Sequence, residues 1–305
     1  DFDRIGTEFH RWVRDASDAI GLHRSTDFEA FINRDFSFYS RQYLRLIKAS
    51  QELVPGLEHV RYNADLGFTL QHMLLLAPLQ PEDTEEVICL KVRLVARFLD
   101  TLLAWRRWNF RRIAYSTMQY AMFLVMRDIR GLAAEPLAQK LSAILHEENE
   151  TFSSNDRLRV HQQNRWPLHL LLARITDYVE TQSGQPSRYN EYVRGTGSNR
   201  YEVEHIWADH PERHEDEFAH PTDFAEYRNR IGGLLILPKS FNASYGDLPY
   251  DEKLPHYVSQ NLLARSLHPQ CYDHNPGFLR FVEQSGLPFL AHEQFRKSDL
   301  DDRGA

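Results

Sequence analysis

The residues whose types and order could do chemistry lie in one segment, 201–253. Glu204 and His205 end a run of alternating polar and apolar residues, which is typical of a β-strand. A second, apolar strand is expected over 233–237, and Asn242 follows it at an expected helix start. An acid beside an imidazole, a glycine-led strand and an amide on a helix could together hold one metal ion against a phosphodiester.

Hydrolysis of a phosphodiester needs an activated water, neutralised charge at the transition state and a stabilised leaving oxygen. His205 is the expected general base, because histidine titrates near neutral pH. Glu204 and Asn242 are the expected oxygen ligands of a hard divalent cation, Mg²⁺ or Mn²⁺. Consecutive strand residues point to opposite faces, so Glu204 and His205 reach one site only if the strand ends or bulges there. Lys253 is expected to contact the phosphate.

The order of these residues resembles the HNH-like nuclease domain at the C-terminus of GmrSD-type modification-dependent restriction proteins and of phosphorothioate-sensing SspE proteins. That pattern has an acid-His-Ile strand, a strand that begins Gly-Asn-Leu, an Asn a few residues later and a downstream Lys. This sequence carries it at Glu204-His205-Ile206, at 232–237, at Asn242 and at Lys253. The similarity extends back through a helix expected over 166–180, and it implies a ββα-metal nuclease.

Two departures from the family pattern bear on activity. Ala208 stands where the family usually has Pro, and Asp209 after it could add a carboxylate near the metal. Gly233 replaces the Asn that in the family helps to hold the histidine. Either Asn229 or another group therefore takes that role, or activity is weakened.

Taken singly, these residues have plainer interpretations. Gly232 and Gly233 are typical of a tight turn into a buried strand. Asn242 could be no more than a helix N-cap, and Lys253 a solvated side chain. The order in which the residues occur, rather than any one of them, indicates a nuclease.

Helices are expected to position this segment. Apolar residues recur at helical spacing through the first half of the chain, most clearly over 90–103 and 115–129, and Gly131 is the expected end of the second of these helices. The predicted fold class is therefore mainly α. A helical scaffold or connector domain is expected over 1–165, followed over 166–305 by a small HNH-like ββα-metal nuclease domain with flanking helices.

Charge is distributed unevenly around a net value of −7. Residues 91–112 hold seven basic side chains and one acid, whereas 202–226 hold nine acids and one base. Phosphate binding requires Lys or Arg and carries no sequence information. The expected contacts with a DNA backbone are Arg106, Arg107, Arg111 and Arg112. The alternative is an amphipathic helix with solvated arginines, or an interface with a neighbouring domain.

Composition describes a soluble globular protein, with 42% hydrophobic residues and a mean hydropathy of −0.54. No apolar run approaches the roughly 20 residues that span a bilayer, so no membrane partner is expected. Cys89 and Cys271 cannot form a disulfide framework and favour a reducing, cytoplasmic setting. Residue 1 is not Met, and in the resembling proteins an NTPase domain precedes this region. An upstream NTPase or sensor domain is therefore an expected partner.

The predicted function is a divalent-metal-dependent endonuclease or nickase that cuts double-stranded DNA with weak sequence specificity, in a bacterial defence against phage. The alternative is a catalytically degenerate module that only binds DNA or regulates, which Gly233 favours. A third possibility is an interaction domain held by structural zinc, because His210 and His214 have the spacing i, i+4. No Cys accompanies that pair, and Pro211 interrupts the helix it would need.

Overall fold

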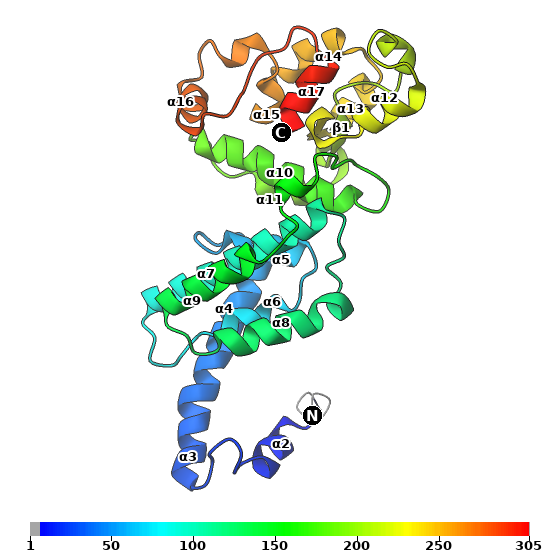
Figure 1. Cartoon of the computed structure of the whole chain (residues 1–305). Helices are drawn as coiled ribbons and strands as arrows, with labels where there is room; N and C mark the ends of the chain where they lie inside the picture. Colours follow the sequence, from blue (N-terminus) through cyan, green and yellow to red (C-terminus); the bar gives the residue numbers. More distant parts are fainter. Residues whose placement is uncertain (1–6, 305) are drawn as a thin grey trace. The chain divides into compact units, whose positions relative to one another are not determined.

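The structure is a computed structural model that describes residues 7–304 (Figure 1). The chain divides into two compact units, Asp1–Asn149 and Glu150–Ala305. Most of the described residues are helical, and the strands among them form one two-stranded sheet in the second unit. The predicted mainly α class with a small sheet in the C-terminal half is confirmed. The division into domains at residue 165 stays a prediction.

The first unit consists of helices around one apolar core. Its helices are α2 (Phe9–Asp15), α3 (Ser25–Ala30), a π-helical stretch η1 (Phe31–Phe36), α4 (Ser37–Gln51), α5 (Glu58–Asp65), α6 (Gln71–Leu76), α7 (Glu85–Trp108), α8 (Tyr115–Ile129) and α9 (Ala134–His146). The Thr84 side chain caps the start of α7. Leu99 and Leu103 on α7 are fully buried, whereas Leu90 at the edge of the predicted stripe is exposed. Gly131 follows α8 with a left-handed φ of 66°, as expected of a residue that ends a helix.

The second unit surrounds its sheet with helices (Figure 1). Its regular elements are α10 (Arg165–Gln182), α11 (Tyr189–Arg194), β1 (Tyr201–His205), α12 (Pro221–Arg228), β2 (Leu234–Pro238), α13 (Lys239–Tyr245), α14 (Tyr250–Tyr257), α15 (Leu262–Arg265), α16 (Pro276–Ser285) and α17 (Lys297–Gly304). Short 3₁₀ turns are η2 (Phe152–Ser154), η3 (Gly197–Asn199), η4 (Pro211–His214), η5 (Ile231–Gly233) and η6 (Pro269–Cys271). None of the helices in the described part of the chain is long and apolar enough to cross a bilayer.

The two strands pair antiparallel, with His205 opposite Leu234. The amide of Ile206 donates to the carbonyl of Gly233 at 2.9 Å, so the pairing continues one residue past β1. A two-stranded sheet is marginal by itself in water and needs packing against helices. Here α10 and α13 each pack against both strands, and β2 is buried from Leu234 to Leu237. The end of β1 is therefore held in position by β2, α10 and α13.

The Gly232-Gly233 pair lies directly beneath α17. A Cβ placed on Gly232 would come within 2.0 Å of the carbonyl oxygen of Leu300, and one on Gly233 would lie 3.0 Å from the Leu300 side chain. The guanidinium of Arg303 donates to the carbonyl of Gly232 and secures the same contact. The expected tight turn into a buried strand is present as η5. The absence of side chains there also lets the backbone of α17 approach.

This close approach predicts that Gly232→Ala destabilises the second unit, by about 1–3 kcal/mol, because the clash is with backbone and cannot be relieved by a rotamer change. Gly233→Ala is the matched control and should cost less, since its Cβ would lie 3.0 Å from the Leu300 side chain and 3.1 Å from the carbonyl oxygen of Arg228, against 2.0 Å at Gly232. Urea denaturation would measure both. Equal unfolding midpoints for Gly232→Ala and wild type would contradict the prediction.

Candidate active site

His205 lies at the end of β1 and is only partly buried, with one ring nitrogen held by Asn229. The distance from its Nε2 to Asn229 Oδ1 is 2.9 Å. Asn229 caps the end of α12, and its Nδ2 donates to the carbonyl of Ala225 at 2.7 Å. This second bond fixes the amide so that Oδ1 faces the ring and can only accept. His205 Nε2 therefore carries the proton, and its Nδ1 keeps a lone pair.

The pKa of His205 is lowered to about 4. Burial of the ring is the largest cause, because it penalises the charged form, and the positive charge of Arg228 is the next. Lys253 and Arg165 add smaller contributions of the same sign. The imidazole is therefore neutral across the physiological range, which is the state a proton acceptor requires.

Glu204, the neighbour of His205, takes part in a buried ion pair. Its carboxylate is 6% exposed and accepts a hydrogen bond of 2.7 Å from the ammonium of Lys253, which is 0% exposed. The same ammonium donates to the backbone carbonyl of His205 at 2.9 Å. Burial raises the pKa of Glu204 and lowers that of Lys253, and the attraction between them opposes both shifts. Glu204 and His205 thus have separate partners, as alternation along a strand requires.

The expected roles of Glu204 at a metal and of Lys253 at a phosphate stay predictions. Lys253, expected at the phosphate, has its ammonium on the Glu204 carboxylate and on a backbone carbonyl. Glu204, expected at the metal, has one oxygen occupied by that ammonium. The pairing spans 49 positions of sequence, and for that reason no local pattern revealed it.

Arg228 is a site residue that sequence reasoning missed. Its Nε donates to the carbonyl of Trp207 at 3.0 Å and lies 4.0 Å from a carboxylate oxygen of Asp209. Burial lowers the pKa of this arginine. Asp209 itself is 76% exposed and free to reach a ligand. The sequence feature that indicates Arg228 is its position, next to Asn229 and shortly before Gly232-Gly233.

Asn242 lies on α13, which packs against both strands. Its Oδ1 is buried and has no hydrogen-bond partner among residues 7–304. A buried amide oxygen without a partner is costly and rare in folded proteins, and it is suited to a hard cation. Among the described residues, no three His, Cys, Asp or Glu side chains gather in a way that could hold a metal ion.

The histidines proposed for zinc have different partners. His210 Nδ1 and Nε2 contact the carboxylates of Glu212 and Asp247 at 2.6 and 2.9 Å, and these bonds raise its pKa. The His214 ring instead packs against Trp207, with ring centroids 4.6 Å apart. Within residues 7–304, neither histidine belongs to a group of three His, Cys, Asp or Glu side chains that could hold a metal ion.

The arginines proposed as DNA contacts lie in the first unit, at and just after the end of α7. The Arg106 guanidinium donates to the carbonyl of Arg112, which fastens the turn after the helix. Arg107 is half-buried, and burial lowers its pKa. Arg111 and Arg112 are exposed. Binding of DNA by these four residues stays a prediction.

The buried pair predicts a strong asymmetry between single and double substitutions. Lys253→Met would leave the Glu204 carboxylate buried without its counter-charge and should cost about 3–5 kcal/mol of unfolding free energy. The double variant Glu204→Gln/Lys253→Met removes both charges and should recover most of that loss. The control Lys239→Met alters an exposed lysine and should stay within about 0.5 kcal/mol of wild type. Urea denaturation decides, and a wild-type midpoint for Lys253→Met would contradict the prediction.

Comparison with known proteins identifies the second unit. No curated protein and no solved structure matches the chain. Residues 144–303, more than half of the chain, match the family model described as GmrSD restriction endonucleases, C-terminal domain. This range contains the sheet, His205, Asn229, Asn242 and the Glu204–Lys253 pair. The chain therefore belongs to the GmrSD restriction endonucleases and carries their C-terminal domain.

Proposed function

We propose that this restriction endonuclease domain cleaves DNA by metal-dependent hydrolysis, with His205 as the general base. The observation that carries the proposal is the His205–Asn229 contact, which places the ring proton on Nε2 and leaves Nδ1 as an acceptor at a partly exposed strand end. In that tautomer, Nδ1 can take a proton from a water that attacks the scissile phosphate. Asn229 acts as a positioning residue, in place of the Asn for which Gly233 is substituted.

Binding of the substrate phosphate is expected to raise the pKa of His205 and so make it a stronger base. A ring with a pKa of about 4 is a weak proton acceptor at neutral pH. A phosphate next to the ring stabilises the imidazolium and raises that pKa, and it also offsets the charge of Arg228. We therefore propose Arg228 as the group that pairs with the phosphate. Lys253 then holds the strand end through Glu204, instead of contacting the substrate.

A divalent cation, Mg²⁺ or Mn²⁺, is part of the proposal. We propose Asn242 Oδ1 and the Asp209 carboxylate as its protein ligands, because among the described residues the first has no hydrogen-bond partner and the second has only a 4.0 Å contact with Arg228. Glu204 would first have to leave Lys253. Mg²⁺ commonly keeps several waters and takes only one or two protein oxygens together with phosphate. When bound, the cation would stabilise the leaving oxygen.

We further propose that one domain nicks one strand per encounter, with little sequence preference, since the domain has one candidate base for one phosphodiester. The biological setting proposed is defence of a bacterium against phage DNA, with recognition by an upstream NTPase or sensor domain. A degenerate module that binds DNA without cutting it is the rival, and the cleavage assay separates the two.

Cleavage of supercoiled plasmid is predicted to require both His205 and a divalent cation. With Mg²⁺ or Mn²⁺, wild type should convert plasmid to open circle, and His205→Ala should lower the rate by about 10²–10⁴-fold because the general base is lost. His274→Ala is the matched control, since His274 is exposed and lies outside the site, and it should cut normally. EDTA should abolish cleavage. Equal nicking by His205→Ala and His274→Ala would remove His205 from the mechanism.

The tautomer argument predicts a pH effect at Asn229. In Asn229→Asp, a carboxylate beside Nε2 stabilises the imidazolium and raises the pKa of His205. A protonated ring cannot accept a proton, so kcat/KM should fall already as the pH drops from about 8 to 6. Wild type should keep its activity there, because its ring protonates only near pH 4. Profiles of kcat/KM against pH report the free enzyme, and those of wild type and Asn229→Asp should differ on the acid side. Coincident acid limbs would contradict the assignment.

A further inference from the structure

A hollow of about 670 Å³ lies in the second unit, beside β1. Its walls are the start of α10, the end of α11 with the turn η3 that follows, and the first three residues of β1. A hollow of this size exceeds what one water or ion fills and is in the range of ligand sites.

The rim of this hollow is basic. Arg165, Arg194 and Arg200 line it and are exposed, against one lining carboxylate, Glu202. Arg200 Nε lies 3.7 Å from Glu202, a loose and solvated contact. Within the described part of the chain, Arg165 and Arg194 have no carboxylate at ion-pair distance. These two guanidinium groups are not neutralised by the protein and can therefore bind phosphate.

An exposed aromatic ring lines the same hollow. Trp166 is 51% exposed, and its indole stacks on the ring of His169, with centroids 5.3 Å apart and planes 10° apart. His169 is buried, its Nε2 contacts the carbonyl of Tyr192 at 2.9 Å, and burial lowers its pKa. The indole is thus supported from one side and presents a flat apolar face. Such faces stack on unpaired bases of any sequence.

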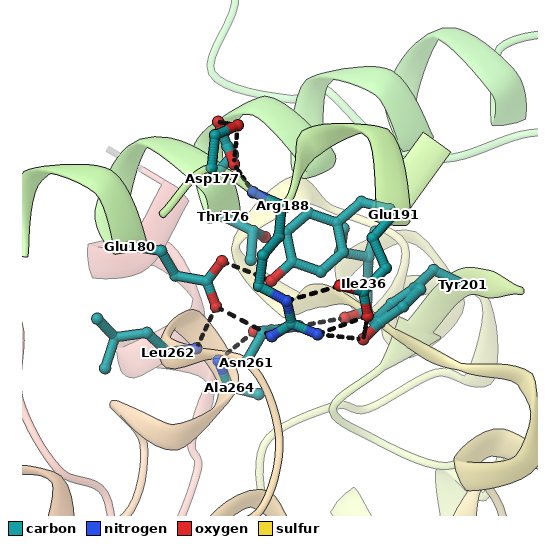
Figure 2. A network of polar contacts seen from close by, with 12 residues as sticks. Thr176, Asp177, Glu180, Arg188, Glu191, Tyr201, Ile236, Asn261, Leu262 and Ala264 are labelled. Carbon is teal, nitrogen blue, oxygen red and sulfur yellow. Dashed lines mark hydrogen bonds and ion pairs between the residues drawn. The ribbon is translucent and has the colours of Figure 1, made fainter. Parts of the chain in front are cut away.

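A polar network around Arg188 connects α10, α11 and β1, which form the walls (Figure 2). The Arg188 guanidinium contacts Glu180, Glu191 and the hydroxyl of Tyr201, the last at 3.0 Å. The Tyr192 hydroxyl donates to Glu180 as well. Tyr192 and Tyr201 both line the hollow. The hydrogen bonds of their hydroxyl groups hold the two rings in position. A pre-formed wall lowers the entropy cost of binding.

The hollow and the proposed base lie along the same strand, β1. Val203 lines it, and His205 lies two residues further on the same face, about 7 Å away at the rise of a β-strand. The charge of Arg165 also contributes to the lowered pKa of His205, so the rim and the base share one electrostatic field.

We propose that this hollow holds the DNA strand next to the cleaved phosphodiester, with its phosphates on Arg165, Arg194 and Arg200 and one unpaired base against Trp166. The proposal rests on the proposed function for its substrate and adds where the strand runs. It requires that the DNA near the cut be locally unpaired, because a base inside a duplex cannot stack on the indole.

Binding can be tested without cleavage, on the full chain carrying His205→Ala, with EDTA and a fluorescent duplex that contains a short single-stranded gap. Arg194→Gln should weaken binding several-fold and lower the slope of log K against log salt by about 0.7–0.9, one phosphate contact. The matched control Arg280→Gln changes an exposed arginine on α16 and should do neither. Trp166→Ala should weaken binding of the gapped duplex about tenfold and of the intact duplex little.

Tyr178→Ala removes an equally exposed ring of the same unit and is the control for Trp166. Equal affinities for Arg194→Gln and Arg280→Gln, or for Trp166→Ala and Tyr178→Ala, would overturn the placement of the strand. That failure is distinct from failure of the proposed function: wild type could still nick plasmid while all four variants bind alike. Thermal unfolding of each variant checks that the exposed substitutions leave the fold intact.

Discussion

The ion pair between Glu204 and Lys253 is the constraint on which the site depends. Both side chains are almost completely removed from water, and the ammonium is also bonded to the carbonyl of His205. Burying two charges is costly unless the geometry is good and further hydrogen bonds satisfy them. Because the Lys253 ammonium also donates to the His205 carbonyl, its hydrogen bonds are complete only when the end of β1 is in place. Residues on β1 and α14 therefore fix the backbone of His205 before any ligand arrives.

Around that fixed point the protein places positive charge and restricts water, and the two together make His205 a poor base in the free protein. Arg228 and the arginines of the basic hollow are suited to an anion that the protein itself does not contain. In the proposed mechanism, the phosphate of bound DNA offsets these arginines and restores proton affinity to the ring. The proposed base would therefore be weak until DNA is bound.

The sequence predicted features that depend on local order, and it did not reveal contacts between distant segments. The helical stripe of α7 and the strand ending at His205 follow from periodicity, because burial of one face leaves a repeat. Asn229 could be named as one of two alternatives for holding the histidine. The contacts of Lys253 with Glu204 and of Gly232 with Leu300 could not be predicted, because the partners lie 49 and 68 positions apart in the sequence. The hollow was equally hidden, since its arginines come from separate elements.

The contact between α17 and Gly232 has a consequence for the folding of the nuclease unit. Leu300 belongs to the same core cluster as Trp207, Leu235 and Phe241, so the nuclease unit cannot finish folding until residues 297–304 have left the ribosome. A nascent chain that has already displayed His205 and Asn229 would still lack the helix that closes over the turn before β2. The arrangement of the site residues therefore depends on α17 as well as on the strands and helices that carry them.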